Sequence, residues 1–260
     1  MHSAFVSGVF DELVDDGLVS PDDHILSVCG GSNERDLFAG LGFTDVIISN
    51  LDDNPNNADT APFEWSRQDA QALSYDDNSF DWAVVVDGLH HCASPHRGLV
   101  ELYRVARRGV IAVEARDSAL MRLAIRSGLT GEHEIEAVVV HQGLAGGLNN
   151  TAIPNYVYRW TEAEFEKTIR SFDPTGEHTF RYRYGLHLPW EAADLRRSRS
   201  KHMVLLVAGP VLRAVTRVWK KECNSIAMVA VKPTELWPWL RTDGNEITFD
   251  TDYGRERFEL

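Results

Sequence analysis

Cysteine is scarce in this sequence, which contains only three cysteines in 260 residues. Cys29, Cys92 and Cys223 are far apart and include no CxxC pair, so the sequence indicates neither a disulfide framework nor a zinc ribbon. The segment 1–20 also lacks the basic start of a secretory signal peptide. We therefore expect a reducing, cytoplasmic location.

Long hydrophobic runs and positive charge are also in short supply. The longest apolar run, 203–212, contains Gly209 and Pro210 and is too short to cross a bilayer, so we expect no membrane partner. The chain carries 26 Lys and Arg against 39 Asp and Glu, a formal charge of −13, which argues against binding to a phosphate backbone. We expect a neutral small molecule as the partner, rather than a nucleic acid or another polyanion.

The sequence does contain an alternation of short apolar runs and helical patterns, within a composition that is 43% hydrophobic. The spacing predicts strands at 24–29, 46–49, 80–86 and 109–114, with helices at 33–41 and 96–106. Strands that are separated by helices form right-handed crossovers in a parallel sheet. The first half is therefore typical of an α/β fold.

The second half is less regular. It contains an irregular segment at 132–157, a helix at 161–172 with Thr161 as N-cap and Glu164 in a capping box, a strand at 179–184, a mainly helical segment at 195–221 and an apolar strand at 225–231. No linker is evident in the sequence. We expect one domain over 1–233, followed by a tail, 234–260, that packs on the domain or extends from it.

The stretch 25–36, ILSVCGGSNERD, joins a predicted strand to a predicted helix through Gly30 and Gly31. Such a turn lets a ligand come close to the backbone, and free N–H groups at the helix start would face that ligand. Ser32 or Asn33 is the predicted N-cap. A tight turn without a ligand is the commoner reason for two glycines, so the motif is informative only together with its neighbours.

Three further polar segments lie near strand ends. They are Asn50-Leu51-Asp52 after the second strand, Asp69-Ala70 ahead of the strand at 80–86, and Asp87-Gly88 directly after it. An acid or amide after the second strand accepts ribose hydroxyls in dinucleotide and nucleoside sites. The Asp69 carboxylate and the Ala70 backbone N–H have the donor and acceptor pattern that suits an adenine ring. Open α/β sheets bind their ligands at the carboxyl ends of the strands, where Asp87 and Gly88 lie.

In order and spacing, these segments resemble the class I S-adenosylmethionine-dependent methyltransferases, in particular their small-molecule branch. The resemblance covers about 25–115 and recurs at 224–233, which looks like the antiparallel last strand of that family's seven-stranded sheet. It implies a Rossmann-like, doubly wound, mostly parallel sheet, with a cofactor half at about 22–117 and substrate-facing insertions at about 130–221. The implied cofactor is S-adenosylmethionine and the implied product S-adenosylhomocysteine. The implied cofactor-binding residues are Cys29, Gly30, Gly31, Asn50, Leu51, Asp52, Asp69, Ala70, Asp87 and Gly88.

The sequence departs from that family's pattern at the glycine motif. Ser27 stands where an acid is usual, and Cys29 and Asn33 stand where glycines are usual. Asn50 and Asp52 both remain candidates for the ribose contact. These departures leave a non-catalytic methyltransferase-like binding module as an alternative. A nicotinamide-dependent oxidoreductase is less favoured, because the sequence has no GxGxxG after its first strand.

Methylation of a hydroxyl requires a base, and histidine suits that role near neutral pH. His90 and His91 follow the strand at 80–86, and His141 lies in the irregular segment 132–157. Glu114 and Asp117 follow the strand at 109–114, where they can orient such a histidine or bind a divalent ion. Scattered carboxylates alone are weak support for a metal, and we predict none.

We predict O-methylation of a sugar or of a hydroxyl on a glycosylated natural product; an RNA acceptor is disfavoured by charge. The basic run 196–201 is typical of a solvated helix face, with contact to an anionic substrate as the alternative. Tyr156, Tyr158 and Trp160 suit either a pocket wall or the core. Nothing in the sequence excludes a homodimer.

Overall fold

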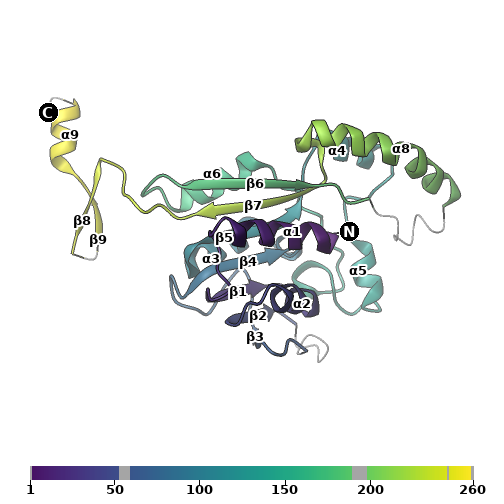
Figure 1. Ribbon diagram of the computed structural model, residues 1–260, viewed down its shortest axis with the longest axis horizontal. Coiled ribbons are helices and arrows are strands. Elements are labelled where there is room, and N and C mark those ends of the chain that lie inside the picture. The colour runs from purple at the N-terminus through teal and green to yellow at the C-terminus, as the bar shows by residue number, and fades with distance from the viewer. Residues whose placement is uncertain (1, 53–58, 189–197, 245, 259–260) are drawn as a thin grey trace.

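The computed structural model describes residues 2–52, 59–188, 198–244 and 246–258. Its centre is a seven-stranded sheet in the order β3-β2-β1-β4-β5-β7-β6 (Figure 1). The strands are β1 (Ile25–Val28), β2 (Val46–Asn50), β3 (Glu64–Arg67), β4 (Phe80–Val86), β5 (Ala106–Ala115), β6 (Thr179–Gly185) and β7 (Ser225–Val231). β7 runs antiparallel to β5 and β6, whereas the other neighbouring pairs are parallel. The prediction of a Rossmann-like, mostly parallel sheet with an antiparallel last strand is confirmed.

Helices cover both faces of this sheet. The helices α3 (Pro95–Val105) and α6 (Glu162–Phe172) pack on one face, and α1 (His2–Asp15) and α2 (Ser32–Gly40) pack on the other. The β4 side chains alternate between the two cores: Ala83 and Val85 face the first, Trp82 and Val84 the second. All four are fully buried, which explains why this strand is a continuous apolar run in the sequence.

Helix capping follows the sequence at α6 but not at α2. At α6, the Thr161 hydroxyl accepts the Glu164 N–H and the Glu164 carboxylate accepts the Thr161 N–H, as the capping-box pattern predicts. α2 begins one residue earlier than expected, and Gly31, not Ser32 or Asn33, is its N-cap. The reason is that Glu34 reaches back to the Gly31 N–H, at 2.7 Å, and caps the helix from its own first turn.

Several elements have no counterpart in the sequence-based expectation. β3 is a short, half-exposed edge strand with the polar sequence EWSR, and so lacks an apolar run. The irregular segment 132–157 contains α5 (Ile135–Val140) and the 3-10 turn η2 (Leu148–Asn150). The remaining elements of the domain are η1 (Leu89–His91), α4 (Ala119–Arg126), and α8 (Arg199–Val218) and η3 (Lys220–Glu222), which lie where the sequence predicted a mainly helical segment. Within the described ranges, no helix is both long and apolar enough to cross a membrane.

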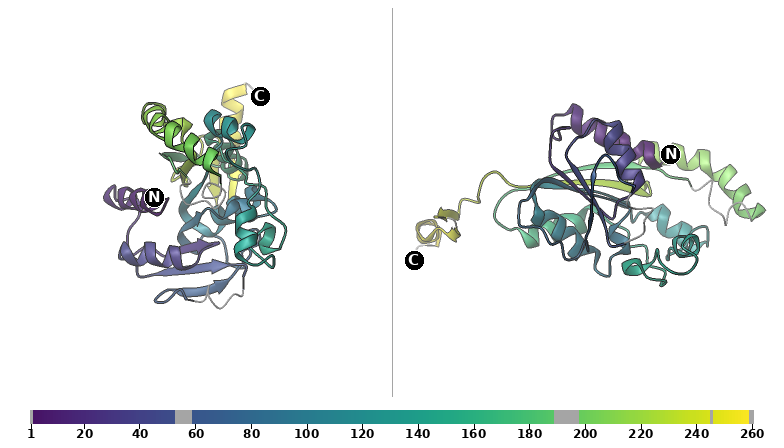
Figure 2. Two further views of the ribbon diagram at one scale, coloured as in Figure 1. Left: turned by 90° about the vertical axis from the view of Figure 1, so that its right-hand side faces the viewer. Right: turned by 90° about the horizontal axis from the view of Figure 1, so that it is seen from below.

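The C-terminal tail starts on the domain and then leaves it. Leu236 pairs with Gly176 in an isolated bridge, and the Trp237 N–H donates to the Thr175 carbonyl at 2.9 Å. Beyond this point come β8 (Leu240–Asp243), β9 (Glu246–Phe249) and α9 (Thr251–Phe258), which lie apart from the sheet in Figure 1 and in the right view of Figure 2. Trp237 stacks on Trp239, with ring centroids 5.0 Å apart, rather than on the domain core.

Candidate functional site

A cavity of about 910 Å³ lies at the carboxyl ends of β1, β2 and β4. Its volume is in the range of small-molecule sites. All ten residues that the sequence implied for cofactor binding line this cavity, namely Cys29, Gly30, Gly31, Asn50, Leu51, Asp52, Asp69, Ala70, Asp87 and Gly88. Of the three candidate catalytic histidines, His91 and His141 line the cavity, whereas His90 is buried beside it and is not part of the lining. Parallel strands therefore bring the polar residues at their ends to one place.

The residues directly after β1 and β4 both have a strained backbone. Cys29 and Asp87 have φ angles of 55° and 48°, in the left-handed region that residues with a Cβ rarely adopt. Gly88 packs directly on this pair, since a Cβ at position 88 would stand 2.5 Å from the Cys29 Cβ. A hydrogen bond with Cys92 and burial raise the pKa of the Cys29 thiol, so Cys29 is a neutral part of the wall.

The glycine turn is already occupied by hydrogen bonds within the protein. The Gly30 N–H donates to the Ser49 carbonyl at 2.9 Å, and the Gly31 N–H donates to the Glu34 carboxylate. Burial raises the pKa of Glu34, although its bond to Gly31 acts in the opposite direction. The prediction that free N–H groups face a ligand here is therefore wrong for these two residues. The turn shapes the cavity, and the N–H groups of Gly30 and Gly31 are already engaged within the protein.

Asn50 is likewise engaged by the fold. Its Oδ1 accepts the Leu51 N–H at 2.7 Å, and its Nδ2 donates to the Gly30 carbonyl at 3.3 Å. An amide has two donors and two acceptor positions, so one of each remains. Asn50 thus ties the end of β2 to the glycine turn, and both Asn50 and Asp52 line the cavity.

The segment with Asp69 and Ala70 is held by a hydrogen-bond network that the sequence did not reveal. Asp69 Oδ1 accepts the backbone N–H of Gln71, and the Gln71 amide donates to Asn149 Oδ1 at 3.1 Å. The same Asn149 oxygen accepts the N–H of Ala93, and Gln71 Oε1 accepts the N–H of Ser94. Asn149 therefore connects the 141–150 loop to Gln71, next to Asp69 and Ala70, and to Ala93.

Glu114 organises the segment after β4. It is fully buried, and its Oε1 accepts the backbone N–H groups of Gly88 and Leu89 at 3.0 and 2.7 Å. Its Oε2 lies 2.8 Å from His90 Nδ1, so Glu114 orients a histidine, as one of the two sequence-based alternatives expected. Asp117, which shared that expectation, instead pairs with Arg122 at 2.7 Å.

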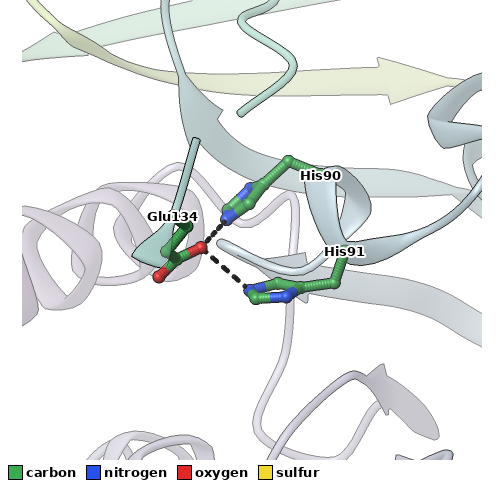
Figure 3. Close-up of side chains that lie close together, drawn as sticks. All are labelled: His90, His91 and Glu134. Carbon is green, nitrogen blue, oxygen red and sulfur yellow. Dashed lines mark ion pairs between the residues drawn. The ribbon is translucent and has the colours of Figure 1, made fainter. Parts of the chain in front are cut away.

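A second glutamate, Glu134, contacts both histidines (Figure 3). The Glu134 carboxylate lies 3.2 Å from His90 Nε2 and 3.3 Å from His91 Nε2. Burial acts to lower the pKa of His90, but the charges and hydrogen bonds of Glu114 and Glu134 outweigh this effect. The net result raises the pKa of His90 to about 10, so His90 carries a proton at neutral pH. Burial and the charge of His90 lower the pKa of His91. Burial raises the pKa of Glu134, but its bond to His90 lowers it more.

Glu134 reaches the histidines because its backbone pairs with the segment near Asn155. The Glu134 N–H donates to the Asn155 carbonyl at 3.0 Å. The Asn155 amide in turn donates to the His90 carbonyl at 3.1 Å and lies 3.5 Å from the Glu134 carboxylate. Neither residue was identified from the sequence, because no spacing rule connects them to the strand ends.

His141 also lines the cavity, directly after α5. Its Nδ1 lies 2.8 Å from the Ala137 carbonyl, and since a carbonyl only accepts, Nδ1 carries the hydrogen. In the neutral ring this leaves a lone pair on Nε2. His91 differs, because its Nε2 faces Glu134 and its ring also bonds the backbone of Gly147.

The described residues among the remaining sequence-based candidates do not line the cavity. Trp160 is in the core, and Tyr158 packs on it at 5.1 Å and bonds Glu164, so the core interpretation holds for these two. Tyr156 is exposed and contacts His133. In the basic run 196–201, residues 196 and 197 lie outside the described residues; Arg199 begins α8.

Residues 28–113 match the protein family described as "Methyltransferase domain". Over these residues the chain is similar to methyltransferase domains of the class I, S-adenosylmethionine-dependent kind. The match covers the strands and turns that build the cavity, from the end of β1 to β5. The cofactor of such a domain is S-adenosylmethionine.

Curated relatives and solved structures share parts of this architecture. The 2-phytyl-1,4-naphtoquinone methyltransferase of Synechocystis sp. is 31% identical over 103 residues, which cover 35% of this chain and 43% of that protein. Magnesium protoporphyrin IX methyltransferase from Synechocystis, with bound S-adenosylhomocysteine, has a TM-score of 0.51 at 17% identity, covering 89% of this chain and 83% of that one. The [4+2]-cyclase SpnF has a TM-score of 0.54 at 16% identity, covering 88% and 82%. The chain spans less than half the length of the curated relatives it matches.

Proposed function

We propose that this protein transfers a methyl group from S-adenosylmethionine to a hydroxyl of a small molecule. The charge of the cavity carries this proposal. Five carboxylates line it (Glu34, Asp36, Asp52, Asp69 and Asp87), and no lysine or arginine is among the described lining residues. S-adenosylmethionine has a sulfonium and an ammonium against one carboxylate, so its net positive charge suits such a wall.

The same charge argues against a nicotinamide dinucleotide. Its pyrophosphate would face the five carboxylates, and the N–H groups of Gly30 and Gly31 that usually hold such a group are bonded within the protein. Repulsion between like charges therefore disfavours the oxidoreductase alternative. It also disfavours an acceptor with several phosphates.

The residues present fit the cofactor along one wall. Asp69 and Ala70 would hold the adenine, and Asp52, with the remaining positions of Asn50, would hold the ribose hydroxyls. Asp87, directly after β4, would face the cationic methionine part. A cavity of about 910 Å³ leaves room for an acceptor beside the cofactor.

His141 is the residue that we assign to the acceptor's proton. When bound, the cofactor would supply an electrophilic methyl group: the methyl carbon would bond to the acceptor oxygen as its bond to the sulfonium sulfur breaks, which leaves a neutral thioether. His141 Nε2 receives the hydroxyl proton, because the other ring nitrogen already donates to Ala137. His90, held between two glutamates, has no nitrogen that faces the acceptor. The wall otherwise orients the two reactants, which supplies most of the rate in this type of reaction.

We propose a neutral hydroxyl on a sugar or a glycosylated natural product as the acceptor. The polar and small residues of the 141–150 loop, Gly146, Gly147, Asn149 and Asn150, suit a polar acceptor. The name of the Synechocystis relative makes a quinone-derived ring the second acceptor class to test.

Calorimetry with S-adenosylmethionine tests the cofactor assignment. We expect binding at micromolar concentration, weakened about tenfold or more in Asp69→Ala, whereas His141→Ala binds normally and lowers turnover by about 10²–10⁴-fold. Glycoside and quinol acceptors are then compared by the formation of S-adenosylhomocysteine. Absence of binding in a folded protein overturns the proposal. Binding without turnover on any acceptor favours the non-catalytic binding module.

A further inference from the structure

We propose that His90, His91 and Glu134 bind a divalent transition-metal ion of the Zn²⁺ class at the cavity wall. Each residue offers one ligand atom, and these atoms lie within 4.8 Å of one another (Figure 3). This inference rests on the proposed function for the role of the ion, but the binding itself does not depend on it.

Two of the three distances between the ligand atoms, those from Glu134 to each histidine, are those of a metal site. Ligands at about 2.0–2.2 Å from one Zn²⁺ ion with tetrahedral angles lie about 3.4 Å from each other. The Glu134 carboxylate is 3.2 Å from His90 Nε2 and 3.3 Å from His91 Nε2. An ion can therefore replace these direct contacts with only small movements of the three side chains.

The surroundings of His90 also have the form that metal-binding histidines require. A ligand histidine usually donates its second ring nitrogen to a carboxylate, which fixes the ring and its tautomer. Glu114 supplies that carboxylate at 2.8 Å from His90 Nδ1, and it is itself held by two backbone N–H groups. His90 Nε2 is thereby directed at Glu134 and His91 (Figure 3).

Two further observations favour a cation at this place. Asn155 Oδ1 is buried and has no hydrogen-bond partner among the described residues, although the other end of the same amide contacts Glu134. A water bound to the ion would donate to such an oxygen. In addition, Glu114 and Glu134 bring two carboxylates together with two imidazoles, and a divalent cation balances this charge when both rings are neutral.

Two histidines and one carboxylate favour Zn²⁺, Fe²⁺ or a similar ion over Mg²⁺, which prefers oxygen ligands. Three protein ligands leave at least one position open, as in catalytic rather than structural sites. His91 is part of the cavity wall, so the open position is accessible to the acceptor oxygen. The ion would lower the pKa of the bound hydroxyl and help its proton to leave toward His141.

The test is calorimetric titration of the full chain with Zn²⁺ after treatment with a chelator, together with the visible absorption of a Co²⁺ complex. We expect one high-affinity site in the wild type that is lost in His91→Ala and in Glu134→Gln. Glu114→Gln should bind about 10–100-fold more weakly, because it only orients His90. Mg²⁺ should not compete.

Two matched variants control for adventitious histidine binding. His133→Ala removes a histidine next to Glu134 that contacts Tyr156 and not the cluster, and His141→Ala removes the proposed base. Both should bind Zn²⁺ like the wild type. Calorimetry with S-adenosylmethionine and circular dichroism are run on every variant to confirm folding. No Zn²⁺ site, or one that persists in His91→Ala and Glu134→Gln, overturns the metal proposal; intact cofactor binding in that case leaves the proposed function standing.

Discussion

Gly88 lies where β1 and β4 end side by side, at the rim of the cavity. Beyond the approach to Cys29, a Cβ at position 88 would stand 2.8 Å from the Val85 Cγ2. Neither neighbour is the free end of a flexible side chain, so the contact cannot be relieved cheaply. Two residues with positive φ angles, Cys29 and Asp87, depend on this close approach.

Gly88→Ala should destabilise the protein by about 1–3 kcal/mol, because overpacking forces the two strand ends apart. Thermal unfolding measures this change, and S-adenosylmethionine binding should weaken in parallel, since Gly88 lines the cavity. Gly8→Ala is the matched control. No atom lies within 4 Å of a Cβ at position 8 in α1, so alanine there should be neutral or slightly stabilising. An unchanged melting temperature in Gly88→Ala would contradict the close packing of β1 on β4.

The sequence identified which residues gather at the rim, but not which of their polar groups are free. Strand ends are predictable because a parallel sheet brings its carboxyl ends together. Whether the Gly31 N–H faces a ligand or Glu34 depends on the side-chain conformation of one residue in the first turn of α2. The same is true of Asn50, whose amide bonds the neighbouring backbone.

At the scale of elements, Glu162 connects the start of α6 to the sheet. Arg116, directly after β5, lies 2.9 Å from the Glu162 carboxylate, and the Tyr184 hydroxyl of β6 donates to it at 2.6 Å. Burial acts to raise the pKa of Glu162, but the hydrogen bond from Tyr184 and the charge of Arg116 outweigh this effect. The net result lowers the pKa of Glu162 to about 2. The ionised carboxylate is thus stabilised in the folded state.

Because the pKa of Glu162 is lowered on folding, its contribution to stability is complete above its ordinary value of 4.5 and disappears as the pH falls toward 2. Glu162→Gln should lower the melting temperature at pH 6, and the difference from the wild type should shrink between pH 5 and pH 2. Partial solvent access keeps the effect modest. Tyr184→Phe, which removes only the hydrogen bond, should show a smaller difference of the same sign. A difference that grows toward low pH would contradict this assignment.

The elements themselves were predictable where a local signal exists. The core strand β4 was predicted residue for residue from its apolar run, and α6 from its capping box. β3 was missed because a half-exposed edge strand needs no apolar run, and α5 because a helix of one or two turns has little periodicity to detect.

At the scale of the whole molecule, the C-terminal hairpin and helix form a separate unit. The hydrogen bonds described for β8, β9 and α9 stay within residues 237–258, and Tyr253 contacts Trp239 rather than the sheet. Ile247 and Phe249 are about half exposed. Nothing in the described part of this unit supports the cavity.

A chain that ends at Trp239 should therefore fold and bind S-adenosylmethionine like the full chain, with a melting temperature within about 2 °C. Trp237 and the bridge between Leu236 and Gly176 are retained in this variant. A chain that ends at Val231 is the comparison, because it also removes the contact with residues 175 and 176 and should be less stable. Loss of cofactor binding on removal of 240–260 would contradict the separation of the two units.

The sequence by itself determined where β1, β2, β4, β5, β6 and β7 lie along the chain, the burial of β4 and the edge of the sheet at which the cavity lies, because all three follow from periodicity and strand direction. Only the tertiary structure decided that Glu134 and Asn155 join His90 and His91, that His90 lies between two glutamates, and that His141 Nδ1 faces the Ala137 carbonyl. These properties depend on contacts between segments far apart in the chain. Local sequence does not encode such contacts, since they arise only when the sheet has brought the segments together.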